Sequence, residues 1–219
     1  MATTDKKLVP ALRYKFLTGF FDALIAATTR EGKIRRTIVQ LAGVRDWCTV
    51  LDLGSGTGTL AILIKSMNPG ATVIGVDVDA NILPLAREKA EDKRVAVEFK
   101  QASADELAFA DGEFDVVTSS LVFHHLDAVT KKAAFREIHR VLGPEGTFLL
   151  ADWGQPTSAV ERLQFYSVQF LDGFATTTDN VRGKLPEFAA EAGFTDFKQV
   201  AKERTVHGVL SYYRGRRSS

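Results

Sequence analysis

A glycine-rich turn lies between a short apolar run and a helix-compatible segment, and this turn constrains the fold more than any other feature. The apolar run covers residues 49–53, the turn carries Gly54, Gly56 and Gly58, and a second apolar segment starts at Leu60. Glycine suits such a turn because it adopts positive φ angles and, lacking Cβ, lets a ligand lie against the backbone. The order of strand, glycine turn and helix therefore predicts an α/β fold with a ligand at the turn.

The middle of the chain, residues 47–152, alternates short apolar runs with helical patterns. This alternation is typical of a parallel sheet with crossover helices. The five predicted strands are residues 49–53, 72–76, 95–99, 114–119 and 147–151. The helical segments between them lie near residues 60–67, 82–91 and 131–142. We therefore predict a doubly wound α/β core.

Two helical regions are expected to cover this core. Residues 8–43 predict an N-terminal helical cover with apolar side chains at i,i+4 spacing, and residues 156–180 predict an inserted lid. Residues 185–214 predict a final helix and then a hairpin of strands 194–201 and 205–214, joined by a tight turn at 202–204. With 219 residues and 45% hydrophobic content, we expect one domain over residues 1–219.

The spacing around the turn favours an amino acid cofactor over a dinucleotide. A dinucleotide fingerprint has the spacing GxGxxG, whereas this turn has GxGxG and Thr59 at the position of the third glycine. Asp52, just before the glycines, would repel a phosphate and attract an ammonium group. Asp77 follows the second strand, where a carboxylate can accept hydrogen bonds from ribose hydroxyls. Taken alone, the glycine run could be only a tight turn, and Asp77 or Asp79 could merely cap the next helix. We favour the capping role only for Asp79.

Five blocks of sequence resemble the motifs of class I S-adenosylmethionine (SAM) dependent methyltransferases, in the family's order. They are residues 50–58 (VLDLGSGTG), 74–79 (IGVDVD), 104–117, 121–126 (LVFHHL) and 140–152. The resemblance is to the small-molecule group that includes the ubiquinone and menaquinone biosynthesis C-methyltransferases. It implies SAM as cofactor and a seven-stranded, mostly parallel Rossmann-like sheet whose last strand is antiparallel, with a helical lid.

The resemblance also implies roles for individual residues. Asp52 would lie near the methionine ammonium, Asp77 would hold the ribose and Val78 would pack on adenine. The implied cofactor-binding set is Asp52, Gly54, Gly56, Gly58, Asp77, Val78, Ser103, Ala104 and Ser119. Two positions depart from the family pattern: Ser103 stands where an Asp is frequent, and Phe21 stands where a Tyr is frequent in the first helix.

Methyl transfer from a sulfonium is an in-line displacement, so the protein mainly aligns the acceptor and excludes water. His124 and His125, just beyond the fourth strand, are the candidates for a base or a substrate ligand, and a structural role for the pair is the favoured alternative. Aromatic side chains gather in the two covering regions and predict a hydrophobic acceptor. The candidate acceptor-binding residues are Tyr14, Phe20 and Tyr166.

Charge and composition narrow the function. Lys and Arg number 28 against 27 Asp and Glu, and this balance offers no basic field for nucleic acid. We predict a cytoplasmic enzyme without a transmembrane segment or a metal, acting on a small, hydrophobic acceptor such as a quinone precursor, a lipid or an aromatic compound. Its oligomeric state is left open. The rival functions are a SAM-binding module without catalysis and an NAD-dependent oxidoreductase.

Overall fold

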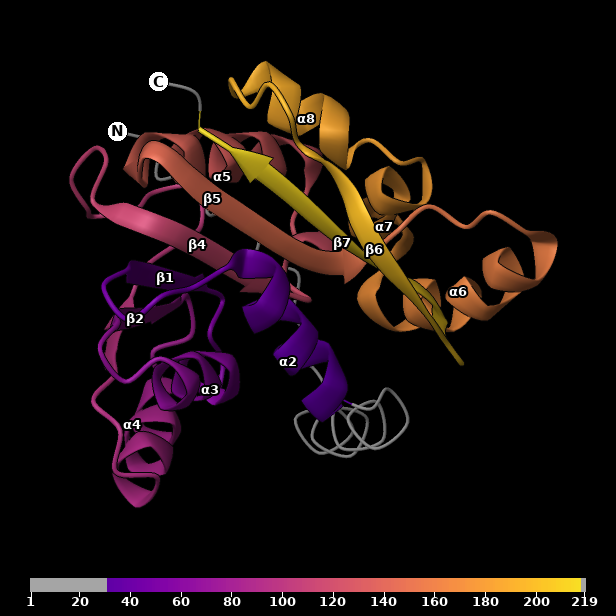
Figure 1. The fold of residues 1–219 in the computed structure, drawn as a ribbon. Helices are drawn as coiled ribbons and strands as arrows, with labels where there is room; N and C mark the ends of the chain where they lie inside the picture. The colour runs from indigo at the N-terminus through magenta and orange to yellow at the C-terminus, as the bar shows by residue number, and fades with distance from the viewer. Residues whose placement is uncertain (1–30, 218–219) are drawn as a thin grey trace, which may run out of the picture.

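The computed structural model describes residues 31–217, which build a seven-stranded sheet in the order β3-β2-β1-β4-β5-β7-β6 (Figure 1). The strands are β1 (Thr49–Leu53), β2 (Thr72–Asp77), β3 (Glu98–Gln101), β4 (Phe114–Ser120), β5 (Leu142–Trp153), β6 (Lys198–Thr205) and β7 (Gly208–Arg216). β7 is antiparallel to both of its neighbours, and all other paired strands are parallel. The prediction of a mostly parallel sheet with an antiparallel last strand is confirmed.

Helices cover both faces of this sheet (Figure 1). They are α2 (Glu31–Ala42), α3 (Thr59–Met67), α4 (Leu83–Asp92), α5 (Ala128–Val141), α6 (Ala159–Asp172), α7 (Phe174–Val181) and α8 (Leu185–Glu191), with a short 3-10 turn, η2 (Phe123–His125). Helices α2, α3 and α4 share one apolar core, and α5 and α8 share the other.

The two cores arise from the alternation of side chains along each strand. In β1, Val50 belongs to the core under α2 and α3, whereas the next residue, Leu51, belongs to the core under α5. In β5, Leu149 faces the first core and Leu150 the second. These four side chains are buried, and each such burial stabilises the fold by about 1.5–3 kcal/mol. A strand covered on both sides must be apolar throughout, which explains the runs seen in the sequence.

The third strand begins three residues later than predicted. The apolar run at 95–99 suggested a strand there, but β3 covers Glu98–Gln101. Val95 ends the turn after α4, with its N–H donating to the carbonyl of Ala90. Val95 and Val97 are partly buried and pack against the core without joining the ladder, so their apolar character reflects this packing.

The terminal hairpin turns later than predicted. The sequence suggested a turn at 202–204, yet these residues lie inside β6, and the connection is Val206 and His207. Thr205 fixes this turn, because its hydroxyl donates to the carbonyl of Gly208 and accepts from the N–H of His207. Gly208 has φ +133°, a conformation that side chains disfavour, so glycine here marks where β7 starts.

The inserted segment between β5 and α8 forms α6 and α7 and is docked onto the core. Ser158 caps α6 by accepting the N–H of Glu161. Lys131 of α5 is fully buried and donates to the carbonyl of Thr176 in α7, and its amine lies 3.5 Å from Asp179. Of the predicted N-terminal cover, residues 8–30 lie outside the described residues. Within residues 31–217, no helix is long and apolar enough to cross a membrane.

Gly75 of β2 offers a direct test of the packing under the sheet. A Cβ there would lie 2.7 Å from the Phe99 ring and 3.0 Å from Cβ of Ser55. We expect Gly75→Ala to lower the free energy of unfolding by about 1–3 kcal/mol, measured by urea denaturation. Gly32→Ala is the matched control, because a Cβ on this helical residue meets nothing within 4 Å. Equal stability of the two variants would contradict the close approach of β2 and Phe99.

Candidate functional site

The glycine turn after β1 crosses the end of β2. The N–H groups of Gly54 and Ser55 both donate to the carbonyl of Val76, each at 2.8 Å. Gly54, Gly56 and Gly58 have φ angles of 72°, 52° and 73°. Such angles favour glycine, because a side chain at these positions would be strained.

The three glycines differ in what surrounds them. A Cβ on Gly54 would lie 2.3 Å from the Val122 side chain, and a Cβ on Gly58 would lie 2.5 Å from the Phe99 ring. A Cβ on Gly56 would meet nothing within 4 Å. The first and last glycines are therefore required by packing as well as by φ, whereas Gly56 leaves open space above the loop.

Asp77 ties the end of β2 to this loop. One carboxylate oxygen accepts the N–H of Gly56 at 2.8 Å, and the other accepts the N–H of Asp79 at 3.0 Å. Each oxygen keeps a second lone pair that can accept from a ligand hydroxyl. Val78, the next residue, is a 53% exposed apolar side chain at the same edge. Asp79 was expected to cap the next helix, but this prediction is wrong. Asp79 accepts the N–H of Asn81 within the turn, whereas α4 starts at Leu83 with Ile82 as its N-cap and no side-chain capping bond.

Asp52 is a buried carboxyl group below the loop, with 2% of its surface exposed. One oxygen accepts the hydroxyl of Thr118 at 3.0 Å, and the other has no hydrogen-bond partner among the described residues. Burial raises the pKa of Asp52 to about 7, although the Thr118 hydrogen bond opposes this shift. A buried acceptor atom that lacks a partner is costly, and an ammonium group would satisfy it.

The end of β3 completes this edge. The N–H of Ala102 donates to the carbonyl of Asp77, and Gln101 donates through its side chain to the carbonyl of Val78. Ser103 is partly buried, and its hydroxyl bonds to the carboxylate of Asp105. Ala104 is also partly buried. Asp105 thus places a carboxylate beside the position where the sequence has serine, a neighbour that the sequence analysis did not single out.

Ser119 is held inside the sheet. Its side chain is fully buried, and the hydroxyl donates to the carbonyl of Leu53 at 3.0 Å. Any contact of this residue with a cofactor must therefore use atoms other than the hydroxyl hydrogen.

These residues fit SAM. The unsatisfied carboxylate oxygen of Asp52 would accept the ammonium, and the open space at Gly56 would take the methionine part. Asp77 and Val78 would supply an acceptor and an apolar surface for the nucleoside. Parallel sheets bind ligands at the carboxyl ends of their strands, where all four residues lie. A buried carboxyl group beside the loop is unsuited to a pyrophosphate.

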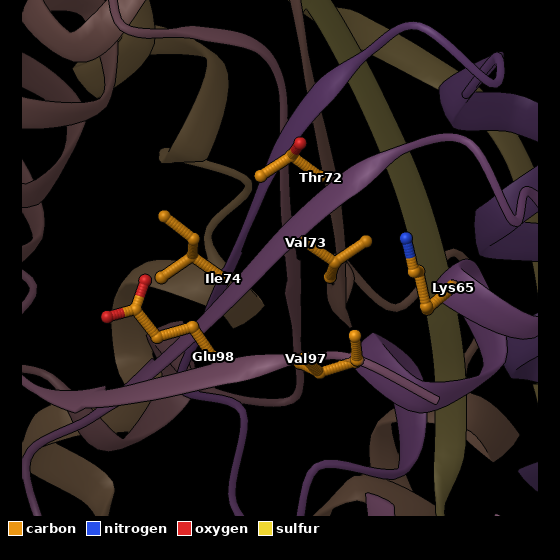
Figure 2. A pocket seen from close by; sticks show the side chains of 7 residues that line it. Lys65, Thr72, Val73, Ile74, Val97 and Glu98 are labelled. Carbon is orange, nitrogen blue, oxygen red and sulfur yellow. The ribbon is translucent and has the colours of Figure 1, made fainter. Parts of the chain in front are cut away.

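A hollow of about 400 Å³ lies elsewhere, at the amino-terminal part of β2 and β3 (Figure 2). Val73, Val97 and Lys65 lie on one side of these strands, with Ile74 and Glu98 on the other (Figure 2). The amine of Lys65 already donates to the carbonyls of Pro69 and Ala71. Because its lining residues are at the start of β2 and β3, the hollow lies away from the strand ends that carry Asp52 and Asp77.

A second group of polar side chains follows β4. His124 is buried and its Nδ1 lies 2.8 Å from a carboxylate oxygen of Asp152, at the end of β5. His124 Nε2 lies 3.5 Å from Asp172, the last residue of α6, and Nδ1 of the half-exposed His125 lies 4.0 Å from the same carboxylate. The structure thus brings both predicted histidines together with two carboxylates. No sequence signal identified Asp172, because nothing in the sequence distinguishes it from an ordinary residue at the end of a helix.

The ionisation of this group follows from its surroundings. Burial by itself raises the pKa of Asp152, but His124 and the N–H of Trp153 outweigh it, so the pKa is lowered overall. The partial burial of the His125 ring and the neighbouring His124 lower the pKa of His125. Asp152 is therefore a carboxylate at neutral pH, and His125 is an uncharged acceptor.

Of the predicted acceptor-binding residues, only Tyr166 lies in the part of the chain that the structure describes. Tyr166 is 38% exposed on α6, where its ring lies 6.3 Å from those of Phe170 and Phe174. The guanidinium of Arg162 lies 4.1 Å from the Tyr166 ring centre. Tyr14 and Phe20 lie outside the described residues.

The sheet order and this edge define the chain as a class I SAM-dependent methyltransferase. Residues 50–146 match the model of the methyltransferase domain family. Demethylmenaquinone methyltransferase of Thermus thermophilus is 37% identical over 158 residues, covering 70% of this chain and 71% of the relative. The ubiquinone/menaquinone biosynthesis C-methyltransferase UbiE of Pseudomonas fluorescens is 30% identical over 202 residues, covering 83% and 77%. A SAM-dependent methyltransferase structure from Methanosarcina mazei, with 21% identity, superposes with a TM-score of 0.63 over 78% of this chain and 92% of that one.

The chain belongs to the family of ubiquinone/menaquinone biosynthesis C-methyltransferases. It is an enzyme, and its cofactor is SAM. The predicted class of enzyme and its cofactor are thereby confirmed. The individual cofactor contacts remain predictions, which the next two experiments test.

Asp77→Ala is expected to weaken SAM binding by about 1–3 kcal/mol, because a charged acceptor of ribose hydroxyls is lost. Isothermal titration calorimetry measures this change directly. Asp79→Ala is the matched control, because Asp79 follows the same strand and accepts the N–H and the side-chain amide of Asn81 within the turn. Unchanged affinity in the Asp77 variant would remove this residue from the cofactor site.

Asp52 predicts a pH dependence of SAM binding. With its pKa at about 7, the carboxyl must lose a proton before it can face an ammonium group. SAM affinity should therefore rise with pH by up to about tenfold per unit below pH 7 and level off above it. Asp52→Asn should bind SAM more weakly and without this dependence. A wild-type affinity that stays constant between about pH 5 and 7 would contradict the assignment.

Proposed function

We propose that the chain transfers the methyl group of SAM to a ring carbon of a hydrophobic, hydroxylated quinone precursor. The observation that carries this proposal is the 37% identity to demethylmenaquinone methyltransferase over 70% of the chain. The exposed aromatic side chains of Tyr166, Phe170 and Phe174 support an apolar acceptor. They lie on α6 and at the start of α7, close in sequence to Asp172. We place the enzyme in the cytoplasm, as the sequence predicts.

The cofactor contacts in this proposal follow the edge of the sheet. Asp52 faces the ammonium, the backbone from Gly54 to Gly58 lines the methionine part, and Asp77 accepts from the ribose. Val78 packs on the adenine, and the backbone of Ala104 contacts its edge. Asp105 takes the adenine amino group in place of an acid at position 103. Its hydrogen bond to Ser103 holds its carboxylate beside that position.

The acceptor lies on the other side of the loop, near η2. Val122 packs on Gly54, so the turn that carries His124 and His125 is a direct neighbour of the cofactor loop. The bound SAM supplies an electrophilic methyl group. The protein holds the acceptor carbon in line with it and excludes water, which accounts for much of the rate of such displacements.

A ring carbon becomes a better nucleophile when a hydroxyl on the same ring loses its proton. The ionised Asp152 accepts from Nδ1–H of His124, so the Nε2 atom of this imidazole is directed toward Asp172 of the lid. His124 and Asp172 can therefore receive or polarise an acceptor hydroxyl. After methyl transfer, the methylated carbon releases its own proton, and the ring regains aromaticity.

An oxidoreductase is disfavoured by the same residues. The loop lacks the third glycine of a dinucleotide site, and Asp52 would oppose a pyrophosphate. A SAM-binding module without catalysis is disfavoured by the hydrogen-bonded His124–Asp152 pair, which follows the Val122 turn that packs on Gly54.

The purified chain is expected to methylate demethylmenaquinone after chemical reduction to the quinol, and not the oxidised quinone, whose ring is electron-poor. Mass spectrometry and NMR of the product would locate the new methyl group on carbon. His124→Gln should lower kcat by about a hundredfold while SAM affinity is kept. His207→Ala is the control for loss of a histidine away from the site. Tight SAM binding without transfer to any hydroxylated prenylated ring would favour the non-catalytic alternative.

A further inference from the structure

Three side chains at the lid end of the site form a compact set of metal-ligand atoms. His124, His125 and Asp172 each offer one ligand atom, and these atoms all lie within 4.8 Å of one another. The two imidazole rings are 3.9 Å apart, centre to centre. Ligands on a tetrahedral ion with bonds of about 2.0–2.1 Å are separated by about 3.3 Å, so the 3.5 Å between His124 Nε2 and Asp172 is already close to that spacing.

Asp152 prepares His124 for such a role. Its carboxylate accepts the N–H groups of Phe123, His124 and Trp153 and the side-chain amide of Asn180. An ionised carboxylate has no hydrogen to donate, so His124 must carry its proton on Nδ1 in order to bond to it at 2.8 Å. Nε2 is therefore the atom through which His124 can bind a metal, and it faces Asp172. A histidine held by a carboxylate through its second nitrogen is the usual outer support of a metal ligand.

The ligand set is also fixed by the fold around it. His124 and His125 belong to η2, between β4 and α5, and Asp172 is the last residue of α6. Asn180 of α7 donates to Asp152 at 3.2 Å and to the carbonyl of Trp153 at 2.9 Å, which ties the lid to the end of β5. The three ligand residues thus come from two elements, η2 and α6, which the core and the lid hold in place.

We propose that His124 Nε2, His125 Nδ1 and the Asp172 carboxylate bind one divalent transition-metal ion. Two imidazoles and one carboxylate suit ions such as Zn²⁺, Fe²⁺, Mn²⁺ and Co²⁺, whereas Mg²⁺ prefers oxygen ligands alone. A three-ligand protein site leaves coordination positions for water or substrate. The sequence predicts no metal, because the two histidines are adjacent and Asp172 lies 47 positions further along.

The place of this ion in the reaction rests on the proposed function, whereas its binding does not. The ligand set adjoins the turn at Val122 that packs on Gly54 of the cofactor loop. There, the ion would polarise the hydroxyl of the acceptor ring, and the hydroxyl proton would pass to solvent. Without an ion, His124 Nε2 would take that proton itself.

Metal binding is tested with the full, tag-free chain, because a polyhistidine tag would bind the same ions. Titration calorimetry with Zn²⁺ is expected to show one site with a dissociation constant of roughly 10 µM or tighter. Co²⁺ should give visible absorption bands that report nitrogen and oxygen ligands. His125→Ala and Asp172→Ala should each weaken Zn²⁺ binding at least about tenfold, and Asp152→Asn should weaken it by about 10–100-fold. His207→Ala is the matched control and should bind as the wild type does.

Absence of saturable binding by either ion would overturn the site, and so would binding that His125→Ala and Asp172→Ala leave unchanged. If Asp152→Asn fails to fold, the other two variants still decide, because neither leaves the buried Asp152 without His124. The methylation assay is run on chelator-treated and Zn²⁺-loaded enzyme. Metal binding without methylation of the quinol would contradict the proposed function alone. Full methylation by an enzyme that binds no metal would contradict the metal site alone.

Discussion

The carbonyl of Val76 accepts two hydrogen bonds, from Gly54 and Ser55, and this shared acceptor draws the loop after β1 across the end of β2. Asp77 then accepts the N–H of Gly56, so the acid of the second strand and the glycine turn form one hydrogen-bonded unit. The rest of the site is arranged around this unit, since Val122 packs on Gly54 and thereby positions the turn that follows β4.

The pKa values of two buried aspartates, Asp52 and Asp152, are shifted in opposite directions because their hydrogen bonding differs. Asp152 accepts several N–H groups and has a lowered pKa, so its contribution to stability is present at neutral pH and is lost as the pH falls through its folded pKa. Asp52 has one hydroxyl donor and a pKa raised to about 7, so it favours the fold most below the unfolded pKa and progressively less as the pH rises toward 7. The fold therefore keeps at Asp52 an unsatisfied acceptor whose natural partner is a cation.

Much of the fold followed from the sequence, since strands covered on both faces must be apolar and the crossover helices lie between them. The errors came where the apolar or charged character of a segment had another cause than the one inferred from the sequence. Val95 and Val97 pack against the core ahead of the ladder, and the hairpin turn was set by Thr205 and Gly208 and not by the charged residues at 202–204. Periodicity reports burial, but it does not say which backbone groups are paired.

The sequence by itself determined the order of the strands along the chain, the glycine loop and the positions of the acids Asp52 and Asp77. These features are local and follow one another along the chain. Only the tertiary structure decided that Asp152 and Asp172 meet His124 and His125. Those contacts join residues 28 to 48 positions apart, across a strand, a helix and the lid. No spacing rule specifies such a meeting, because it depends on how α6 and α7 pack on the end of β5.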